Sequence, residues 1–181
     1  MNKNERLVWI DLEMTGLNPE VDVILEIATI ITDNQLTIIA EGPALIIHQP
    51  QSALVVMDDW VRNQHSKTGL IDAVIKSSMT IAVAQEETLD FIKAHCPPKD
   101  AILSGNSVWQ DRTFLRKSMP RIVEYLHYRI IDVSSIKELA KRWYPKSPFI
   151  KFEKPDTHRA LQDVKGSIKD LGHYRKYFFI Q

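Results

Sequence analysis

Residues 7–17 read Leu-Val-Trp-Ile-Asp-Leu-Glu-Met-Thr-Gly-Leu, and this stretch decides how the fold begins. Its apolar, β-forming start predicts a strand over Leu7–Leu12. On a strand, residues two apart project from the same face, so the carboxylates of Asp11 and Glu13 are expected side by side. Adjacent carboxylates repel each other and resist burial, and a divalent cation resolves both problems. A strand end that emerges into solvent is the simpler explanation of this pair taken alone.

The segments that follow predict a meander of three strands, and then strands that alternate with helices. The strands are expected at Leu7–Leu12, Val23–Asp33, Leu36–His48, Ala101–Ser104 and Ile130–Val133, and the helices at Met57–Lys67, Thr80–His95, Gln110–Ser118, Ser134–Tyr144 and Thr157–Phe178. Gly69 is a plausible stop for the first helix, and Ser134 or Ser135 is expected to cap the fourth. Residues 145–156 hold three prolines and are expected to form a loop. This order predicts an α/β fold, a mixed sheet with an antiparallel meander of three strands plus parallel strands, flanked by α-helices.

Length and composition predict one globular domain over residues 1–181. Hydrophobic residues make up 44% of the chain and charged residues 25%, which excludes disordered and collagen-like proteins. The single cysteine, Cys96, excludes an intramolecular disulfide and a CxxC zinc or redox site. No signal-peptide core and no run of ~18 apolar residues is found, so no membrane association and a cytoplasmic location are expected.

The formal net charge of zero conceals two oppositely charged halves. Residues 1–111 carry 7 Lys and Arg against 16 Asp and Glu, whereas residues 112–181 carry 16 against 7. Such halves could supply a cation site and an anion site in one molecule, or they could simply be two solvated faces. Zero net charge argues against binding of long-duplex nucleic acid, which depends on many phosphate contacts, but it permits a short anionic ligand.

Two further segments carry residues suited to chemistry. Asp111 follows the predicted strand Ala101–Ser104, at a place where α/β sheets often bind ligands, although a helix cap explains a lone aspartate better. His158 and Asp163 lie five residues apart, ~140° around a straight helix. If both serve one site, His158 should precede the helix and Asp163 should lie one turn inside it. A lone histidine there is more often an ordinary helix-start or surface residue.

Taken together, these segments predict a metal-dependent hydrolase. Four carboxylates from three segments offer oxygen ligands, which favour two hard cations such as Mg²⁺ or Mn²⁺. Two such ions ~3.5–4 Å apart form the clamp used in phosphodiester hydrolysis. A neutral histidine beside them could accept the proton of the attacking water, and the rate should then fall as the imidazole becomes protonated.

The order Asp11, Glu13, Asp111, His158 and Asp163 resembles that of the DEDDh 3′→5′ exonucleases, whose fold is ribonuclease H-like. Four more stretches resemble the branch of this family that degrades very short RNAs, and the likeness covers nearly the whole chain. They are Met57-Asp58-Asp59-Trp60, Gly105-Asn106-Ser107, His127-Tyr128-Arg129 and Asp132-Val133-Ser134. The resemblance implies a homodimer that hydrolyses short oligoribonucleotides, chiefly dinucleotides, to 5′-mononucleotides.

The resemblance also implies a role for each site residue. Asp11, Glu13, Asp111 and Asp163 would hold two metal ions, and His158 would be the general base. Leu17 would wedge between the two bases, Trp60 and His65 would line the base pockets, Ser107, Arg129 and Ser134 would bind the 5′ phosphate, and Tyr128 would come from the partner subunit. Trp109 departs from the pattern because it is bulkier than expected, which leaves the local loop packing in doubt.

Two rival functions remain open. A DNA 3′→5′ exonuclease of the proofreading type would use the same five catalytic residues, and preference for a long strand over a dinucleotide would favour it. A non-catalytic nucleotide-binding module would bind nucleotide without metal uptake or product. Trp60, Tyr128 and His65 also have ordinary explanations, as a packing residue, a buried tyrosine and a solvated helix-end residue.

Overall fold

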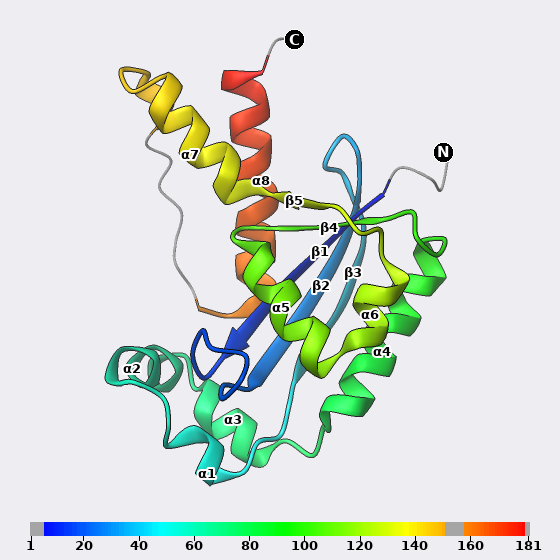
Figure 1. Ribbon diagram of the computed structural model, residues 1–181, viewed down its shortest axis with the longest axis vertical. Coiled ribbons are helices and arrows are strands. Elements are labelled where there is room, and N and C mark those ends of the chain that lie inside the picture. The colour runs from blue at the N-terminus through cyan, green and yellow to red at the C-terminus, as the bar shows by residue number, and fades with distance from the viewer. Residues whose placement is uncertain (1–5, 151–157, 180–181) are drawn as a thin grey trace.

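The computed structural model describes residues 6–150 and 158–179, which fold around a five-stranded sheet (Figure 1). The strands are β1 (Arg6–Met14), β2 (Ile24–Asp33), β3 (Ile38–Ile46), β4 (Ile102–Gly105) and β5 (Ile130–Asp132). Their order across the sheet is β3-β2-β1-β4-β5. The pairs β1–β2 and β2–β3 are antiparallel, whereas β1–β4 and β4–β5 are parallel. The predicted mixed sheet is therefore confirmed.

The helices cover both faces of the sheet and one end of it. They are α1 (Gln51–Leu54), α2 (Asp59–Lys67), α3 (Leu70–Lys76), α4 (Ile81–His95), α5 (Val108–Ser118), α6 (Pro120–Tyr125), α7 (Val133–Trp143), the 3-10 turn η1 (Pro148–Ile150) and α8 (Ala160–Phe178). Figure 1 shows α4, α5 and α6 on one side of the sheet and α8 on the other. Helices α1, α2 and α3 gather where β1 ends. Within the described ranges, no helix is long and apolar enough to cross a bilayer.

The alternation of side chains along β1 divides the core into two layers. Val8, Ile10 and Leu12 pack on the side of α4 and α5. Leu7 and Trp9 pack on the opposite side, among residues of α7 and α8. Because residues two apart share a face, Asp11 and Glu13 follow Trp9 onto the side of the sheet that α8 covers.

Several boundaries differ from the sequence-based predictions. The short helices α1, α3 and α6 were not predicted, because four to seven residues carry too little periodicity. Gly69 ends α2 as expected, but its left-handed φ of 70° lets the chain turn directly into α3. Pro120 starts α6, since the first position of a helix needs no N–H donor.

The predicted cap of α7 was wrong. Neither Ser134 nor Ser135 is the N-cap residue, because Asp132 at the end of β5 occupies that position and its carboxylate accepts from Ser134 N. An aspartate that directly precedes the first turn satisfies the free N–H groups there. Helix α8 begins at Ala160, and Thr157, the predicted start, lies outside the described residues.

Candidate active site

Three carboxylates meet where β1 passes beneath the start of α8. Asp11 and Glu13 come from β1 and Asp163 from the first turn of α8, and one oxygen atom from each lies within 4.8 Å of the others. Side-chain alternation places the first two on one face, and the packing of α8 on Trp9 brings the third to them. The explanation of Asp11 and Glu13 as a strand end in solvent therefore fails, because Glu13 is only 8% exposed.

Asp111 lies next to this cluster but is not one of the three that meet. It is buried in the first turn of α5, and its Oδ1 accepts a hydrogen bond of 2.9 Å from the backbone N–H of Leu12, between the two β1 acids. It does not cap a helix with this contact. The bond instead holds its carboxylate against β1, beyond the stretch of β1 that pairs with β4.

The electrostatics of the cluster fit a divalent cation. Burial raises the pKa of Glu13 to about 8, and the negative charges of Asp163, Glu26 and Asp111 add to the effect. Burial likewise raises the pKa of Asp111 to about 7. Carboxylates forced together in this way need positive charge to be ionised together, and an all-oxygen donor set suits hard cations. The residues present therefore fit a divalent metal site.

Protein stripped of divalent ions is expected to lose stability as the pH rises from about 6.5 to about 8. With its pKa raised to about 8, folded Glu13 keeps a proton that the unfolded chain has already released, and Asp111 acts in the same sense. Stability falls with rising pH wherever the folded state binds more protons. The window starts near 6.5 because burial lowers the pKa of His65, which gives the opposite slope as unfolded histidine titrates.

Thermal melts in EDTA across this window measure the slope. Glu13→Gln cannot titrate, so its melting temperature should fall less steeply with pH than that of the wild type. Exposed Glu87→Gln on α4 is the matched control and should keep the wild-type slope. Equal slopes for all three proteins would contradict the assignment of the effect to Glu13.

His158 and Asp163 occupy the positions that their spacing predicts. His158 lies two residues before α8 with a left-handed φ of 47°, and Asp163 lies in the first turn of the helix. The ring of His158 meets the ring of Trp60 edge to face, with centroids 5.6 Å apart. The imidazole therefore contacts a second element, α2, which carries Trp60.

A cavity of about 360 Å³ opens beside the cluster. Its lining includes Glu13, Leu17, Trp60, His65 and His158, so four predicted site residues and one of the β1 acids share one space. Leu17 and Trp60 are 72% and 62% exposed, which excludes Trp60 as an ordinary packing residue. Such a volume lies in the ~300–1,000 Å³ range of small-ligand sites.

His65 lies at the floor of this cavity and is not a solvated helix-end residue. It is only 4% exposed, and its Nε2 lies 2.9 Å from the carbonyl oxygen of Met14. Its Nδ1 lies 3.8 Å from Glu13 Oε2. Since burial lowers the pKa of His65, the ring is neutral at pH 7 and this approach is not an ion pair.

Ser107 and Ser134 lie side by side, at the starts of α5 and α7. Ser107, with a left-handed φ of 50°, precedes α5, and its Oγ lies 3.0 Å from the Oγ of Ser134 in α7. Asp132 accepts from the backbone N–H of both serines, at 3.0 and 2.9 Å. Arg129 does not contact either serine within the described residues; its guanidinium lies over the ring of Tyr128, 5.4 Å from the centroid.

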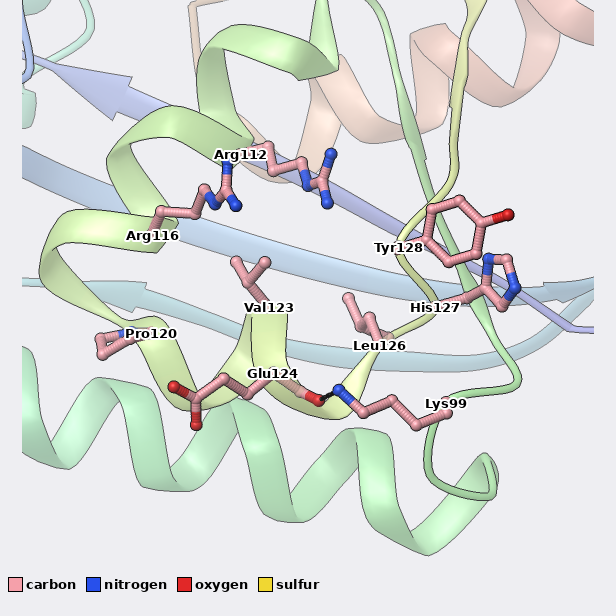
Figure 2. Close-up of a pocket in the computed structure, with 9 residues that line it drawn as sticks. All are labelled: Lys99, Arg112, Arg116, Pro120, Val123, Glu124, Leu126, His127 and Tyr128. Carbon is pink, nitrogen blue, oxygen red and sulfur yellow. Dashed lines mark hydrogen bonds between the residues drawn. The ribbon is translucent and has the colours of Figure 1, made fainter.

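Tyr128 does not line the cavity that holds Glu13. Its side chain is 67% exposed and stacks on His127, so it is not an ordinary buried tyrosine. It lines a separate groove of about 670 Å³ between α5 and α6, together with Arg112, Arg116 and Lys99 (Figure 2). Tyr128 is thus the one predicted substrate-binding aromatic that this chain does not bring to its own acidic cluster.

Sequence reasoning missed the residues that support the site. Asp22 accepts from Thr15 Oγ1 and Asn18 N, both at 2.9 Å, and so shapes the loop that presents Leu17. The amide of Gln110 donates to the carbonyl of Leu17. Glu26 and Arg159 pair beneath the start of α8. A glutamate inside the apolar stretch of β2 was the one visible signal, because such residues are rarely buried without a partner.

Comparisons with known proteins agree with this geometry. An exonuclease family model matches residues 8–171. The oligoribonuclease of Acinetobacter baylyi is 49% identical over 99% of this chain and 97% of its own length. The oligoribonuclease of Marinobacter nauticus is 49% identical over 99% of each chain, and that of Pseudomonas aeruginosa is 48% identical over 98% of each.

Solved structures share the fold at much lower sequence identity. Exonuclease I of E. coli in complex with a dT13 oligonucleotide is 15% identical, with a TM-score of 0.73 over 97% of this chain. Exonuclease I of Methylocaldum szegediense is 17% identical, with a TM-score of 0.70 over 96% of this chain. The chain spans 41% of the length of each of these proteins. This likeness confirms the ribonuclease H-like architecture.

The exonuclease family model spans most of the sequence. The match to the curated relatives covers almost the full length of this chain and of each relative. The residues that converge at the start of α8 lie inside that matched region. The chain therefore belongs to the exonuclease family and, within it, to the oligoribonucleases.

Proposed function

We propose that this chain is a 3′→5′ exoribonuclease that hydrolyses very short RNAs, chiefly dinucleotides, to 5′-mononucleotides in the cytoplasm. The observation that carries the proposal is the meeting of Asp11, Glu13 and Asp163 beside a cavity lined by Trp60 and His158. An acidic cluster alone is a cation site. An acidic cluster next to an exposed aromatic face and an imidazole is a site for a nucleotide and its phosphodiester.

The acids act by holding two divalent ions, Mg²⁺ or Mn²⁺. Asp11, Glu13 and Asp163 would supply the ligands, and Asp111, which is hydrogen-bonded to Leu12, would complete the set from the first turn of α5. When bound, the ions supply positive charge for the attacking water and for the leaving oxygen. The crowding that raises the pKa of Glu13 is then relieved, so all the carboxylates are ionised in the working enzyme.

His158 is the general base of the proposed reaction. Its left-handed backbone directs the ring toward Trp60, at the edge of the cavity where the scissile phosphate would lie. A neutral imidazole there accepts the proton of the attacking water, while Trp60 restricts the motion of its ring. Leu17 would wedge between the two substrate bases, and Trp60 and the uncharged His65 would line the base pockets.

The length limit of the substrate would come from the starts of α5 and α7, which carry Ser107 and Ser134. Their hydroxyl groups, 3.0 Å apart, offer hydrogen bonds to a terminal 5′ phosphate, with Arg129 following from the next loop. A closed end of this kind suits a dinucleotide and stops a long strand. Hydrolysis of a labelled RNA dinucleotide compared with a long single strand tests this, and preference for the long strand would favour the DNA-exonuclease alternative.

Trp60→Ala is expected to raise KM for an RNA dinucleotide by about 10-fold to 100-fold. Stacking of a base on an aromatic ring contributes ~1–3 kcal/mol, and the exposed face of Trp60 offers it here. Steady-state kinetics measure the change. Trp143→Ala is the matched control because Trp143 is 67% exposed on α7 and does not line the cavity, so its KM should stay at the wild-type value. Equal KM values for Trp60→Ala and wild type would remove Trp60 from the base site.

A mixture of two impaired variants is expected to recover activity if Tyr128 serves the partner subunit of a homodimer. Asp11→Asn loses the metal site but keeps Tyr128, whereas Tyr128→Ala keeps the metal site. Half of the randomly mixed dimers then contain one complete site, which gives about a quarter of wild-type activity. Co-refolding of the two variants followed by a dinucleotide assay measures this. Activity no higher than the mean of the separate variants would place Tyr128 in its own site or in none.

A further inference from the structure

The start of α8 is held to the sheet by an ion pair between Arg159, whose side chain is 39% exposed, and Glu26, whose side chain is buried. Glu26 is only 1% exposed in β2, where it lies opposite Glu13 in the β-sheet register. The guanidinium of Arg159, the residue after His158, binds it with two donors, Nε to Oε2 at 3.0 Å and Nη2 to Oε1 at 2.8 Å. This forked contact fixes orientation as well as distance, because both donors lie in one rigid plane.

The same carboxylate also serves the first turn of the helix. Glu26 Oε2 accepts from the backbone N–H of Ala160 at 3.3 Å, and Asp163 Oδ2 accepts from the backbone N–H of Arg159 at 3.1 Å. Arg159 is the N-cap residue, and its own side chain makes no capping bond. Two acids, one from β2 and one from the metal cluster, thus satisfy donors that a helix start leaves free.

His158 depends on its neighbours to keep its conformation. Its φ of 47° is in the left-handed region, which residues other than glycine adopt only where the surroundings impose it. The residue that follows His158 is Arg159. Its side chain is bound to Glu26, and its backbone N–H donates to Asp163. The fixed geometry of Arg159 is therefore well placed to impose the backbone angle on which the imidazole position depends.

A purely structural role explains this arrangement poorly. Glu26 places a negative charge beside Glu13, in a region where three other carboxylates already converge, and the positive charge of Arg159 has to offset it. A buried ion pair is weak evidence for stability, since apolar residues often replace one without loss. A serine or aspartate at the N-cap position would also hold the helix start without that added charge.

We propose that Glu26 and Arg159 are positioning residues, which hold His158 and Asp163 in register with the acids of β1. The inference rests on the proposed function, in which His158 is the base and Asp163 a metal ligand. Neither Glu26 nor Arg159 touches the reacting atoms in this account. They act through the backbone of residues 158–160, so their loss should displace the two functional groups without removing them.

Arg159→Gln is expected to lower kcat for a dinucleotide by about 30-fold to 100-fold while KM changes less than about threefold, because small displacements cost rate more than binding. Arg159→Lys keeps the positive charge but loses the forked pair of donors, so its kcat should lie between those of wild type and Arg159→Gln. This variant replaces Arg159→Gln in the test if Arg159→Gln folds poorly. Lys165→Gln is the matched control: it breaks another ion pair between α8 and the sheet, Lys165 with Glu41 at 2.9 Å. It should keep the wild-type kcat.

Two further measurements separate positioning from general destabilisation. In a His158→Asn background, Arg159→Gln should lower kcat by less than about threefold more, since residues that act through one another are not additive. Mn²⁺ affinity measured by calorimetry should fall about 10-fold in Arg159→Gln, because a residue that orients a ligand affects metal binding. An unchanged kcat, full additivity with His158→Asn, or unchanged Mn²⁺ affinity would overturn the proposal. Failure of the proposed function is distinct, since it appears as a wild-type kcat in His158→Asn alone.

Discussion

Replacing Asp11 by asparagine is expected to lower kcat for an RNA dinucleotide by about 1,000-fold or more. The substitution keeps the shape of the side chain but removes one of the three charges that meet at the cluster. Charge stabilisation by metal ions is worth several kcal/mol, and ~4 kcal/mol corresponds to about 1,000-fold in rate. The measurement is single-turnover hydrolysis of a labelled dinucleotide at saturating Mg²⁺ or Mn²⁺.

The fold should survive this substitution, which makes the loss of rate interpretable. One buried repulsion disappears in Asp11→Asn, so the metal-free protein should melt at or above the wild-type temperature. Asp72→Asn, an exposed aspartate of α3, is the matched control and should keep the wild-type rate. Hydrolysis by Asp11→Asn within about tenfold of wild type would show that the acidic cluster is not the catalytic centre.

The acids of the site could be predicted because they belong to strongly patterned elements. Strand alternation alone places Asp11 and Glu13 together. The burial of Glu13 agrees with the prediction that a carboxylate pair in an apolar run needs a cation. The helical spacing of His158 and Asp163 predicted one residue before a helix and one inside it. Spacing could not predict the distance between Asp163 and the carboxylates of Asp11 and Glu13. That distance depends on tertiary packing, because α8 crosses β1 near Trp9 and so brings Asp163 to the pair.

The supporting contacts could not be predicted, because they join residues far apart in the sequence. Glu26 and Arg159 are separated by 133 positions, and Gln110 lies 93 positions from the Leu17 carbonyl that it binds. The prediction of the α7 cap was wrong for a related reason. Serines inside the first turn are reasonable caps by local preference, yet Asp132 at the end of β5 also accepts from Ser107, and this distant contact favours the aspartate.

Replacing His158 by asparagine is expected to lower kcat by about 100-fold to 10,000-fold, the usual contribution of a general base. Asparagine is the informative substitution because it adopts the left-handed φ of 47° more readily than alanine does.

Addition of free imidazole to His158→Asn should recover part of the lost rate, because a small base can enter the vacated space beside Trp60. His48→Asn, an exposed histidine after β3, is the control and should match wild type with or without imidazole. The rescue distinguishes two reasons for a low rate. A histidine that only packed against Trp60 would leave a variant whose rate free base cannot restore. Only loss of the proton acceptor itself gives a low rate that added imidazole recovers.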